Sequence, residues 1–373
     1  MVIIVMALVV FGLVVLQNFL YKKFWQEGLS MNIRFSSKEA FEGDGLFLYQ
    51  ELSNKKILPL PWVLMKFNLS SNLIFEDAPK DGIDRPELSR QSALFSVMMY
   101  QNVKRKLKFT CGKRGFYRIR AARITCNNLL HTKHFDAGLD CHSELTVFPK
   151  ILDNYEEFGL MYKSLDAAML SSSLINPDPF EFKGLREYNP TDPLRNVNFK
   201  ATAVAQQLMV NIYAPTSSKR LEIVLNVEHH SQYPNFELYE QGIRLAATVA
   251  SRYINEDVKV SLSTNGGDVY LGNQIRIQGG NSPAHLYSIL EALARVETIF
   301  RAAPISPYLN EVNDLDVVYL IISSYHGEDF LQAIEGMKDR GLDYFVIVPT
   351  DTSEKSENNA PIESDRLKIW EAL

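Results

Sequence analysis

The sequence contains few cysteines and no recognisable catalytic motif. Three cysteines in 373 residues are too few for a disulfide scaffold. It has no G-x-S-x-G nucleophile elbow and no glycine-rich phosphate loop between a strand and a helix. A net charge of −5 argues against a dedicated nucleic-acid binder. We therefore expect a protein that is not an enzyme and uses no cofactor or nucleic acid; a hydrolase without a recognisable motif is the weakest alternative.

Only the N-terminus carries an apolar run long enough to span a membrane. Hydrophobic residues make up 46% of the chain and charged residues 22%, a globular composition that argues against a polytopic membrane protein. The run over residues 2–21, interrupted only at 17–18, would form about 30 Å of helix, enough to cross a bilayer. Lys22, Lys23 and Trp25 follow it, as in an interfacial anchor.

A cleaved signal peptide is the competing interpretation of this run. It would carry positive charge before the apolar segment and a small-residue cleavage site after it, and the sequence has neither. We expect a retained single-pass anchor over residues 1–23 in the cell membrane. The lysine pair should remain on the cytoplasmic side, which places the soluble bulk there as well.

Residues 31–150 are typical of a β-sandwich-like domain. Strand-like segments alternate with turn signals, and no helical periodicity spans the region. Its basic segment, 104–123, contains interleaved aromatic residues. Nucleic acid and anionic lipid are possible partners of such a segment, but alternating charge favours a solvated sheet face.

Residues 219–350 change to alternating strands and helices. Apolar strand-like runs near 220–227, 258–264, 315–324 and 343–349 alternate with helical patterns at 236–254, 283–300 and 328–340. Ser282 is a predicted N-cap, and Gly341 closes the last helix. This order predicts a mainly parallel sheet covered on both faces.

The remaining segments have weaker patterns. Residues 151–218 are interpreted as a connector, since Pro177 and Pro179 argue against continuous regular structure there. Asn265 and Gly266 are typical of a hairpin turn. Residues 351–373 form a tail, which we expect to end in a short helix from about Arg366.

A family resemblance lies in residues 184–203, GLREYNPTDPLRNVNFKATA. The segment resembles the signature of the bacterial domain-of-unknown-function family 58, as does the Arg-Gly-x-Tyr stretch at 114–117. The positions that fit are Gly184, Arg186, Tyr188, Asp192, Arg195, Lys200 and Ala203. The positions that depart are Thr191, Asn198, Phe199 and Val204.

The resemblance implies an architecture and a partner. The architecture is α+β multidomain, with a membrane segment, a β region and an α/β von Willebrand factor A-like domain of Rossmann type. Members usually carry two membrane segments, whereas this sequence shows one. The family is associated with MoxR-type AAA+ ATPases and has no established reaction. We therefore expect a membrane-anchored interaction or scaffold protein that works with such an ATPase in assembling or maturing an envelope complex or another protein complex.

The charges of the signature allow two roles. Asp192 followed by Pro193 has the sequence form of a helix N-cap with proline in the first turn. Arg186 and Arg195 can pair with Glu187 or Asp192, or they can accept a partner's carboxylate in a bidentate fork. The cluster is therefore either a structural clasp that ties the connector to the α/β domain or a recognition site.

The end of the first α/β strand is the candidate metal site. The von Willebrand A-like pattern would place Asp-x-Ser-x-Ser there, whereas this sequence has Asn226, Glu228 and His230 at those positions. Magnesium requires octahedral oxygen ligands, so we expect a degenerate site. A cation-dependent adhesion module remains the alternative, as does another metal on Glu228, His229 and His230. A loose Cys/His group, Cys126, His131, His134, Cys141 and His142, lacks the tight spacing of zinc ligands.

Overall fold

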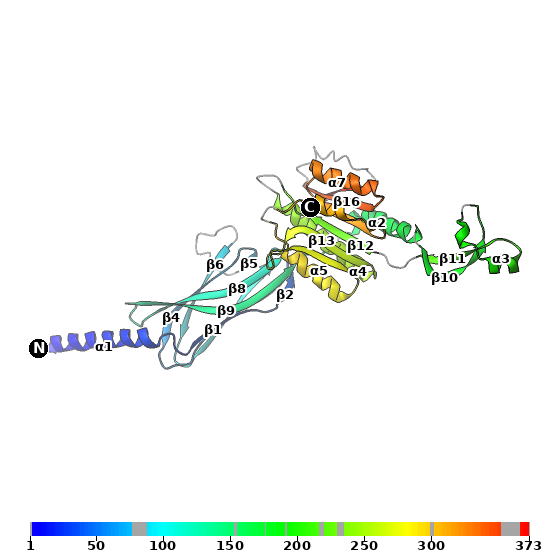
Figure 1. The fold of residues 1–373 in the computed structure, drawn as a ribbon. Helices are drawn as coiled ribbons and strands as arrows, with labels where there is room; N and C mark the ends of the chain where they lie inside the picture. Colours follow the sequence, from blue (N-terminus) through cyan, green and yellow to red (C-terminus); the bar gives the residue numbers. More distant parts are fainter. Residues whose placement is uncertain are drawn as a thin grey trace. The chain divides into compact units, whose positions relative to one another are not determined.

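The computed structural model describes residues 2–76, 88–152, 155–175, 177–190, 192–215, 220–229, 235–298, 302–351 and 366–372. The chain divides into two compact units, residues 1–150 and 151–373. Figure 1 shows the elements of both.

The first unit begins with helix α1 (Val2–Phe24). This helix is exposed, and it is long and apolar enough to cross a membrane. Membrane anchors and signal sequences both have this property. The predicted anchor segment is thus a single helix. Trp25 differs from the prediction, because it is only 7% exposed and its ring stacks on Phe135 of the sandwich.

The rest of this unit is a sandwich of two β-sheets, as predicted. One sheet has the order β1-β3-β7-β5 and the other β2-β9-β8-β4-β6. The first comprises β1 (Leu29–Phe35), β3 (Gly45–Asn54), β7 (Asn102–Cys111) and β5 (Leu73–Phe75). The second comprises β2 (Glu39–Phe41), β9 (His134–Phe148), β8 (Gly115–Asn127), β4 (Leu60–Ser70) and β6 (Leu88–Val97).

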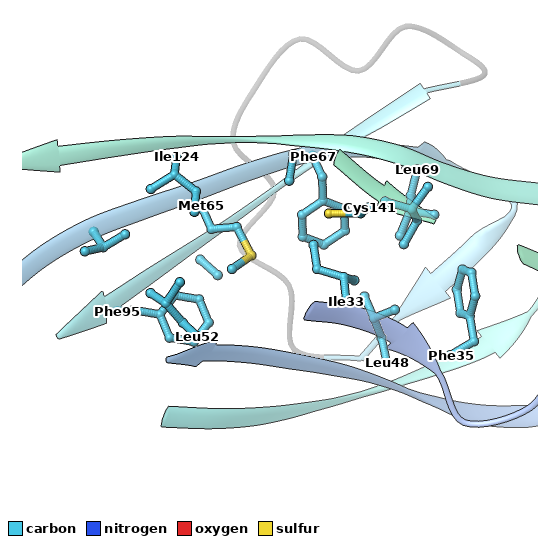
Figure 2. Packing of buried hydrophobic residues seen from close by; sticks show 14 of the residues in the cluster. Ile33, Phe35, Leu48, Leu52, Met65, Phe67, Leu69, Phe95, Ile124 and Cys141 are labelled. Carbon is cyan, nitrogen blue, oxygen red and sulfur yellow. The ribbon is translucent and has the colours of Figure 1, made fainter. Parts of the chain in front are cut away.

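The core of the sandwich lies between its sheets. Figure 2 shows Leu48 and Leu52 of β3 opposite Met65 of β4 and Ile124 of β8. Every second residue of these strands points inward, as the period of two in a β-strand requires. Burial of these apolar side chains stabilises the sandwich.

The basic segment lies on β7 and β8, which belong to different sheets, so it is not the single sheet face that was predicted. Lys104 and Lys108 are exposed and form ion pairs with Glu51 and Glu76 at 3.4 Å and 2.7 Å. Lys106 lies 3.5 Å from the ring centroid of an aromatic neighbour, Phe47. Acidic and aromatic side chains of the same domain are thus the partners of these three lysines.

The second unit contains a six-stranded sheet in the order β14-β13-β12-β15-β16-β17. Five strands are parallel and β14 is antiparallel to β13, so the predicted mainly parallel sheet is confirmed. The strands are β12 (Arg220–Asn226), β13 (Lys259–Gly267), β14 (Gln274–Gly280), β15 (Val318–Ser323), β16 (Asp343–Asp351) and β17 (Leu367–Ala372). The helices are α4 (Phe236–Asn255), α5 (Pro283–Arg295), α6 (Ser306–Glu311) and α7 (Glu328–Asp339).

Helices cover both faces of this sheet. On one face, Phe330 and Met337 of α7 and Leu309 of α6 pack in one cluster with alternate residues of the strands. On the other, α4 lies so close that a Cβ at Gly242 would meet Ile322 Cγ2 at 3.2 Å. The predicted caps are present: Ser282 Oγ accepts from the backbone N of His285 at 3.1 Å, and Gly341 follows α7 with φ +73°.

Three sequence interpretations of this unit are wrong. Residues 155–175 of the supposed connector form the long helix α2 (Tyr155–Ile175), and β10 begins at Pro177. Asn265 and Gly266 lie inside β13, and the turn falls after Gly267, which pairs with Gln274. The end of the tail is strand β17, parallel to β16, rather than a helix.

Helix α2 packs on the α/β domain through mixed contacts. Tyr253 OH of α4 donates a 2.9 Å hydrogen bond to Asp166 of α2. The Arg252 guanidinium lies 3.7 Å from the Tyr162 ring centroid, and Phe158 contacts the Trp370 ring. These contacts make α2 a structural part of the α/β domain.

Candidate functional site

The family-like segment belongs to a small substructure. Along the sequence this substructure follows α2 and precedes β12 of the six-stranded sheet. Strand β10 (Pro177–Glu187) pairs antiparallel with β11 (Met209–Pro215), and between them the chain forms the 3-10 helix η1 (Leu194–Asn196) and helix α3 (Phe199–Ala205). We call residues 177–190 with 192–215 the signature lobe.

A bidentate ion pair closes the loop that leaves β10. Arg186 Nη1 and Nη2 donate to Asp192 Oδ2 and Oδ1, both at 2.6 Å. The backbone N of Asn189 donates to the same carboxylate at 2.8 Å. The Arg186 guanidinium, and next the Asn189 amide, lower the pKa of the Asp192 carboxyl. The carboxylate is thus ionised and held in place, but both partners belong to the predicted connector, so this pair does not tie the connector to the α/β domain.

Asp192 is not the helix cap that its sequence context suggests. Helix α3 is capped by Asn198, whose Oδ1 accepts from the backbone N of Ala201 at 3.0 Å. Asn198 Nδ2 also donates to Asn211 Oδ1 of β11 at 2.8 Å. Asn198, a departure from the family pattern, therefore fastens α3 to the strand pair.

The other signature residues are not all brought together. The backbone N of Tyr188 donates to Leu208 O at 2.8 Å and ties the two strands. A Cβ at Gly184 would meet nothing within 4 Å, so packing does not require glycine there. Arg195 and Lys200 are exposed, and within the described parts of the chain neither forms an ion pair.

The signature lobe exposes large apolar side chains, of which the sequence patterns singled out only Phe199 and Val204, as departures from the family pattern. The exposed fractions are 57% for Phe182, 42% for Leu185, 71% for Leu194, 79% for Phe199, 83% for Val204 and 48% for Leu208. Only Val197 and Val210 are buried hydrophobics among the described side chains of the lobe. A segment this small cannot bury its apolar surface in a core of its own.

The second candidate site lies where the order of the parallel strands reverses, at the carboxyl ends of β12 and β15. Asn226 is 2% exposed and its Nδ2 donates to Ser323 Oγ at 3.0 Å. Its Oδ1 accepts from Asn265 Nδ2 at 2.7 Å and from the backbone N of Glu228 at 3.0 Å. Both polar atoms of the amide are therefore engaged in protein hydrogen bonds.

The other predicted ligands are placed differently. Glu228 is 1% exposed, and its Oε2 accepts from the backbone N of Ile305 at 3.2 Å. His230 lies outside the described residues. Within those residues no group of three or more His, Cys, Asp or Glu side chains is arranged to hold a metal ion. Asn226 Oδ1 and Glu228 Oε2 accept hydrogen bonds that join strand ends to loops.

A recess of about 200 Å³ with a mixed polar and apolar lining adjoins this network on the side of Asn265. Its lining includes Ser263, Arg276 and Tyr308. Ser263 Oγ and Tyr308 OH both bond the Glu222 carboxylate, and the Arg276 guanidinium lies 4.6 Å from the Tyr308 ring centroid. Sequence reasoning missed this recess because its residues come from three separate segments, 263–265, 274–276 and 303–311.

The Cys/His group of the sandwich is not a reactive cluster. Cys126 and Cys141 are buried, and burial raises the pKa of the Cys126 thiol to about 11. His131 and His134 interact with the side-chain amide of Asn127 at 3.1 Å and 2.9 Å. These side chains serve packing and loop geometry.

Comparisons with known proteins do not assign a family. No protein-family model and no curated protein matches the chain. The ASH / PapD-like domain 7 of human CEP192 is matched at 13% identity and TM-score 0.20, over 32% of this chain and 86% of that one. A non-cellulosomal cohesin from the archaeon Archaeoglobus fulgidus is matched at 10% identity and TM-score 0.22, over 32% and 91%. The CARDB domain of the PF1109 protein from Pyrococcus furiosus is matched at 9% identity and TM-score 0.21, over 32% of this chain and 94% of that one. Scores this low assign neither fold nor function.

Proposed function

We propose that this chain is a membrane-anchored, non-enzymatic interaction protein whose signature lobe binds a protein partner. Helix α1 anchors it in the cell membrane and the soluble bulk lies in the cytoplasm. The partner that the family-like signature implies is a MoxR-type AAA+ ATPase, acting in the assembly or maturation of a protein complex.

The observation that carries the proposal is the exposed apolar surface of the signature lobe. Phe199 and Val204 on α3 are about four-fifths exposed, and Leu194 is nearly as accessible. Protein interfaces combine apolar anchors of this kind with arginine and a polar rim. Arg195 and Lys200 supply cations for acidic groups of a partner, while Arg186 is committed to the clasp with Asp192.

The strand order supports a von Willebrand A-like α/β domain. Numbered from β12, the six-stranded sheet runs 3-2-1-4-5-6, the order of doubly wound nucleotide-fold sheets. The strand ends where such sheets bind ligands are occupied by the hydrogen bonds of Asn226, Asn265 and Ser323. This favours an interaction role over the cation-dependent alternative.

The test is a binding measurement with the full chain in detergent micelles and the MoxR-type ATPase of the same cell. Phe199→Ser and Arg195→Ala alter exposed side chains and should leave the fold intact. Each should weaken binding about tenfold, the effect of losing an interface anchor worth about 1.4 kcal/mol. Leu315→Ser, at a 58% exposed position of the α/β domain, is the matched control. Equal affinity of all four proteins would remove the signature lobe from the interface.

A further inference from the structure

One end of the β-sandwich carries exposed apolar side chains on its loops. They lie in the β3–β4, β6–β7 and β8–β9 connections. We call the following set the apolar loop ring: Ile57 (67% exposed), Met98 (50%), Met99 (56%), Tyr100 (69%), Leu129 (50%) and Leu130 (54%). At the other end, the described loops 42–44, 70–72 and 112–114 consist of Glu, Gly, Asp, Ser, Asn, Lys and Arg. A concentration of apolar side chains at one end indicates a contact surface.

Hydrogen bonds join these loops to the carboxyl end of helix α1. Asn128 Nδ2 donates to Asn18 Oδ1 at 2.6 Å, which places the β8–β9 loop beside the helix. Lys56 Nζ donates to Trp25 O at 2.6 Å, and the backbone N of Tyr100 donates to Lys56 O at 3.2 Å. Figure 1 shows the β8–β9 hairpin reaching along the last turns of α1.

The junction between α1 and the sandwich is packed. Tyr21 is 1% exposed and its OH donates to Pro59 O at 2.6 Å. The rings of Tyr21 and Trp25 both stack on Phe135, with centroids 6.5 Å and 6.2 Å away. A packed and hydrogen-bonded junction fixes how deep the loops lie when α1 is in a membrane.

The exposed apolar surface of α1 extends beyond the level at which the loops meet it. Phe19 and Leu20 are 60% and 37% exposed and follow Asn18, the residue that contacts the β8–β9 loop. A bilayer that covers Phe19 and Leu20 therefore also reaches the depth of Leu129 and Leu130. If these loop residues faced water, large apolar surfaces would stay hydrated beside the acyl chains.

We propose that the apolar loop ring is a second lipid-contacting surface, which inserts into the boundary between acyl chains and headgroups of the membrane that α1 crosses. Exposed Lys22, Lys23, Lys55 and Lys133 belong to the helix end and the same loops, where ammonium groups meet anionic headgroups. The sandwich is thereby seated on the bilayer at a fixed angle. This inference rests on the membrane anchor of the proposed function and adds to it a surface that holds the sandwich in one orientation.

The experiment places an environment-sensitive fluorophore on single cysteines of the full chain. Leu130→Cys and Met99→Cys report the ring, Leu13→Cys reports α1, and Lys113→Cys reports the polar end of the sandwich. The protein is reconstituted in phosphatidylcholine vesicles containing phosphatidylglycerol, with and without nitroxide-labelled lipid. We expect blue-shifted emission that nitroxide lipid quenches at positions 130, 99 and 13, and water-like, unquenched emission at 113.

Each other outcome overturns the proposal in an identifiable way. Quenching at 13 without quenching at 130 and 99 leaves the anchor intact and removes the lipid contact of the ring. Blue-shifted but unquenched emission at 130 and 99 shows that protein covers the ring, as in contact with a second copy. Absence of quenching at 13 removes the anchor, and the lipid contact with it.

Discussion

Asn226 and Ser323 join two neighbouring parallel strands at their carboxyl ends through a 3.0 Å hydrogen bond from Nδ2 to Oγ. In open α/β sheets this crevice, where the strand order reverses, is the usual ligand site. Here Ser323 Oγ in turn donates to Tyr325 O at 2.8 Å, and Asn226 Oδ1 accepts two further hydrogen bonds. Both polar atoms of the Asn226 side chain are thus engaged by the protein itself at this point.

Asn226→Asp should destabilise the α/β domain. The new carboxylate would lose the Nδ2 donor and stand buried beside Glu228, which is 1% exposed. We expect a loss of about 1–3 kcal/mol in the free energy of unfolding, the cost of an unsatisfied buried group. Urea unfolding measures it, and Asn310→Asp, at an exposed position of α6, should change stability by less than about 0.5 kcal/mol. Equal stabilities would show that the network tolerates a charge.

Magnesium should leave the unfolding of the unmodified chain unchanged. A cation that binds only the folded state raises the unfolding midpoint with its concentration. Since Asn226 Oδ1 and Glu228 Oε2 already accept backbone or side-chain N–H groups, we expect no shift. Thermal unfolding with and without magnesium chloride measures it. A midpoint that rises with magnesium but not with an equal ionic strength of sodium chloride would favour the cation-dependent module.

Gly266→Ala should be far more damaging than Gly267→Ala. A Cβ at Gly266 would lie 2.7 Å from Val296 Cγ1 and 3.0 Å from Val227 Cγ2, whereas one at Gly267 meets nothing within 4 Å. Overpacking of this kind costs about 1–3 kcal/mol. Urea unfolding of the two variants makes a matched comparison, because the substitutions are identical and adjacent in β13. Similar midpoints would mean that Val296 moves aside freely.

These positions also show what periodicity can and cannot predict. Strand β15 is buried throughout and apolar at every position before Ser323, and α4 has a helical apolar period, so the α/β pattern is local and was predictable. The strand assignment of Asn265 and Gly266 depends on a cross-strand neighbour, Asn226, that lies 39 residues away. Pairing with β16 decides in the same way that residues 367–372 form a strand.

The candidate sites show the same difference between local signals, which are predictable, and long-range pairing, which is not. The pairing of Arg186 with Asp192 was predictable from proximity and charge, and the structure contains it. Asn198 was noted only as a departure from a pattern, although it caps α3 and bonds Asn211. Its role depends on the antiparallel pairing of β10 with β11, which no local signal predicts.

The carboxyl group of Asp192 should titrate below its ordinary pKa of 3.8. A lowered folded-state pKa means that the ionised form stabilises the folded lobe above the unfolded-state pKa. The contribution is lost as the pH falls through the folded-state value. NMR of the side-chain carboxyl carbon in the full chain measures this titration. Arg186→Gln should raise the midpoint, whereas Arg195→Gln should not; an unchanged midpoint in Arg186→Gln would contradict the clasp.

The three cysteines should not react with thiol reagents in the folded chain. Cys111 and Cys126 are 0% exposed, and burial raises the pKa of each thiol to about 11, so at pH 8 both are neutral as well as inaccessible. Cys141 is 6% exposed and its pKa is also raised by burial. Maleimide labelling at pH 8 should modify none of them until urea unfolds the sandwich, and then all three. Fast labelling at pH 8 in native conditions would show that the sandwich core is accessible, in conflict with the packing of β4, β8 and β9.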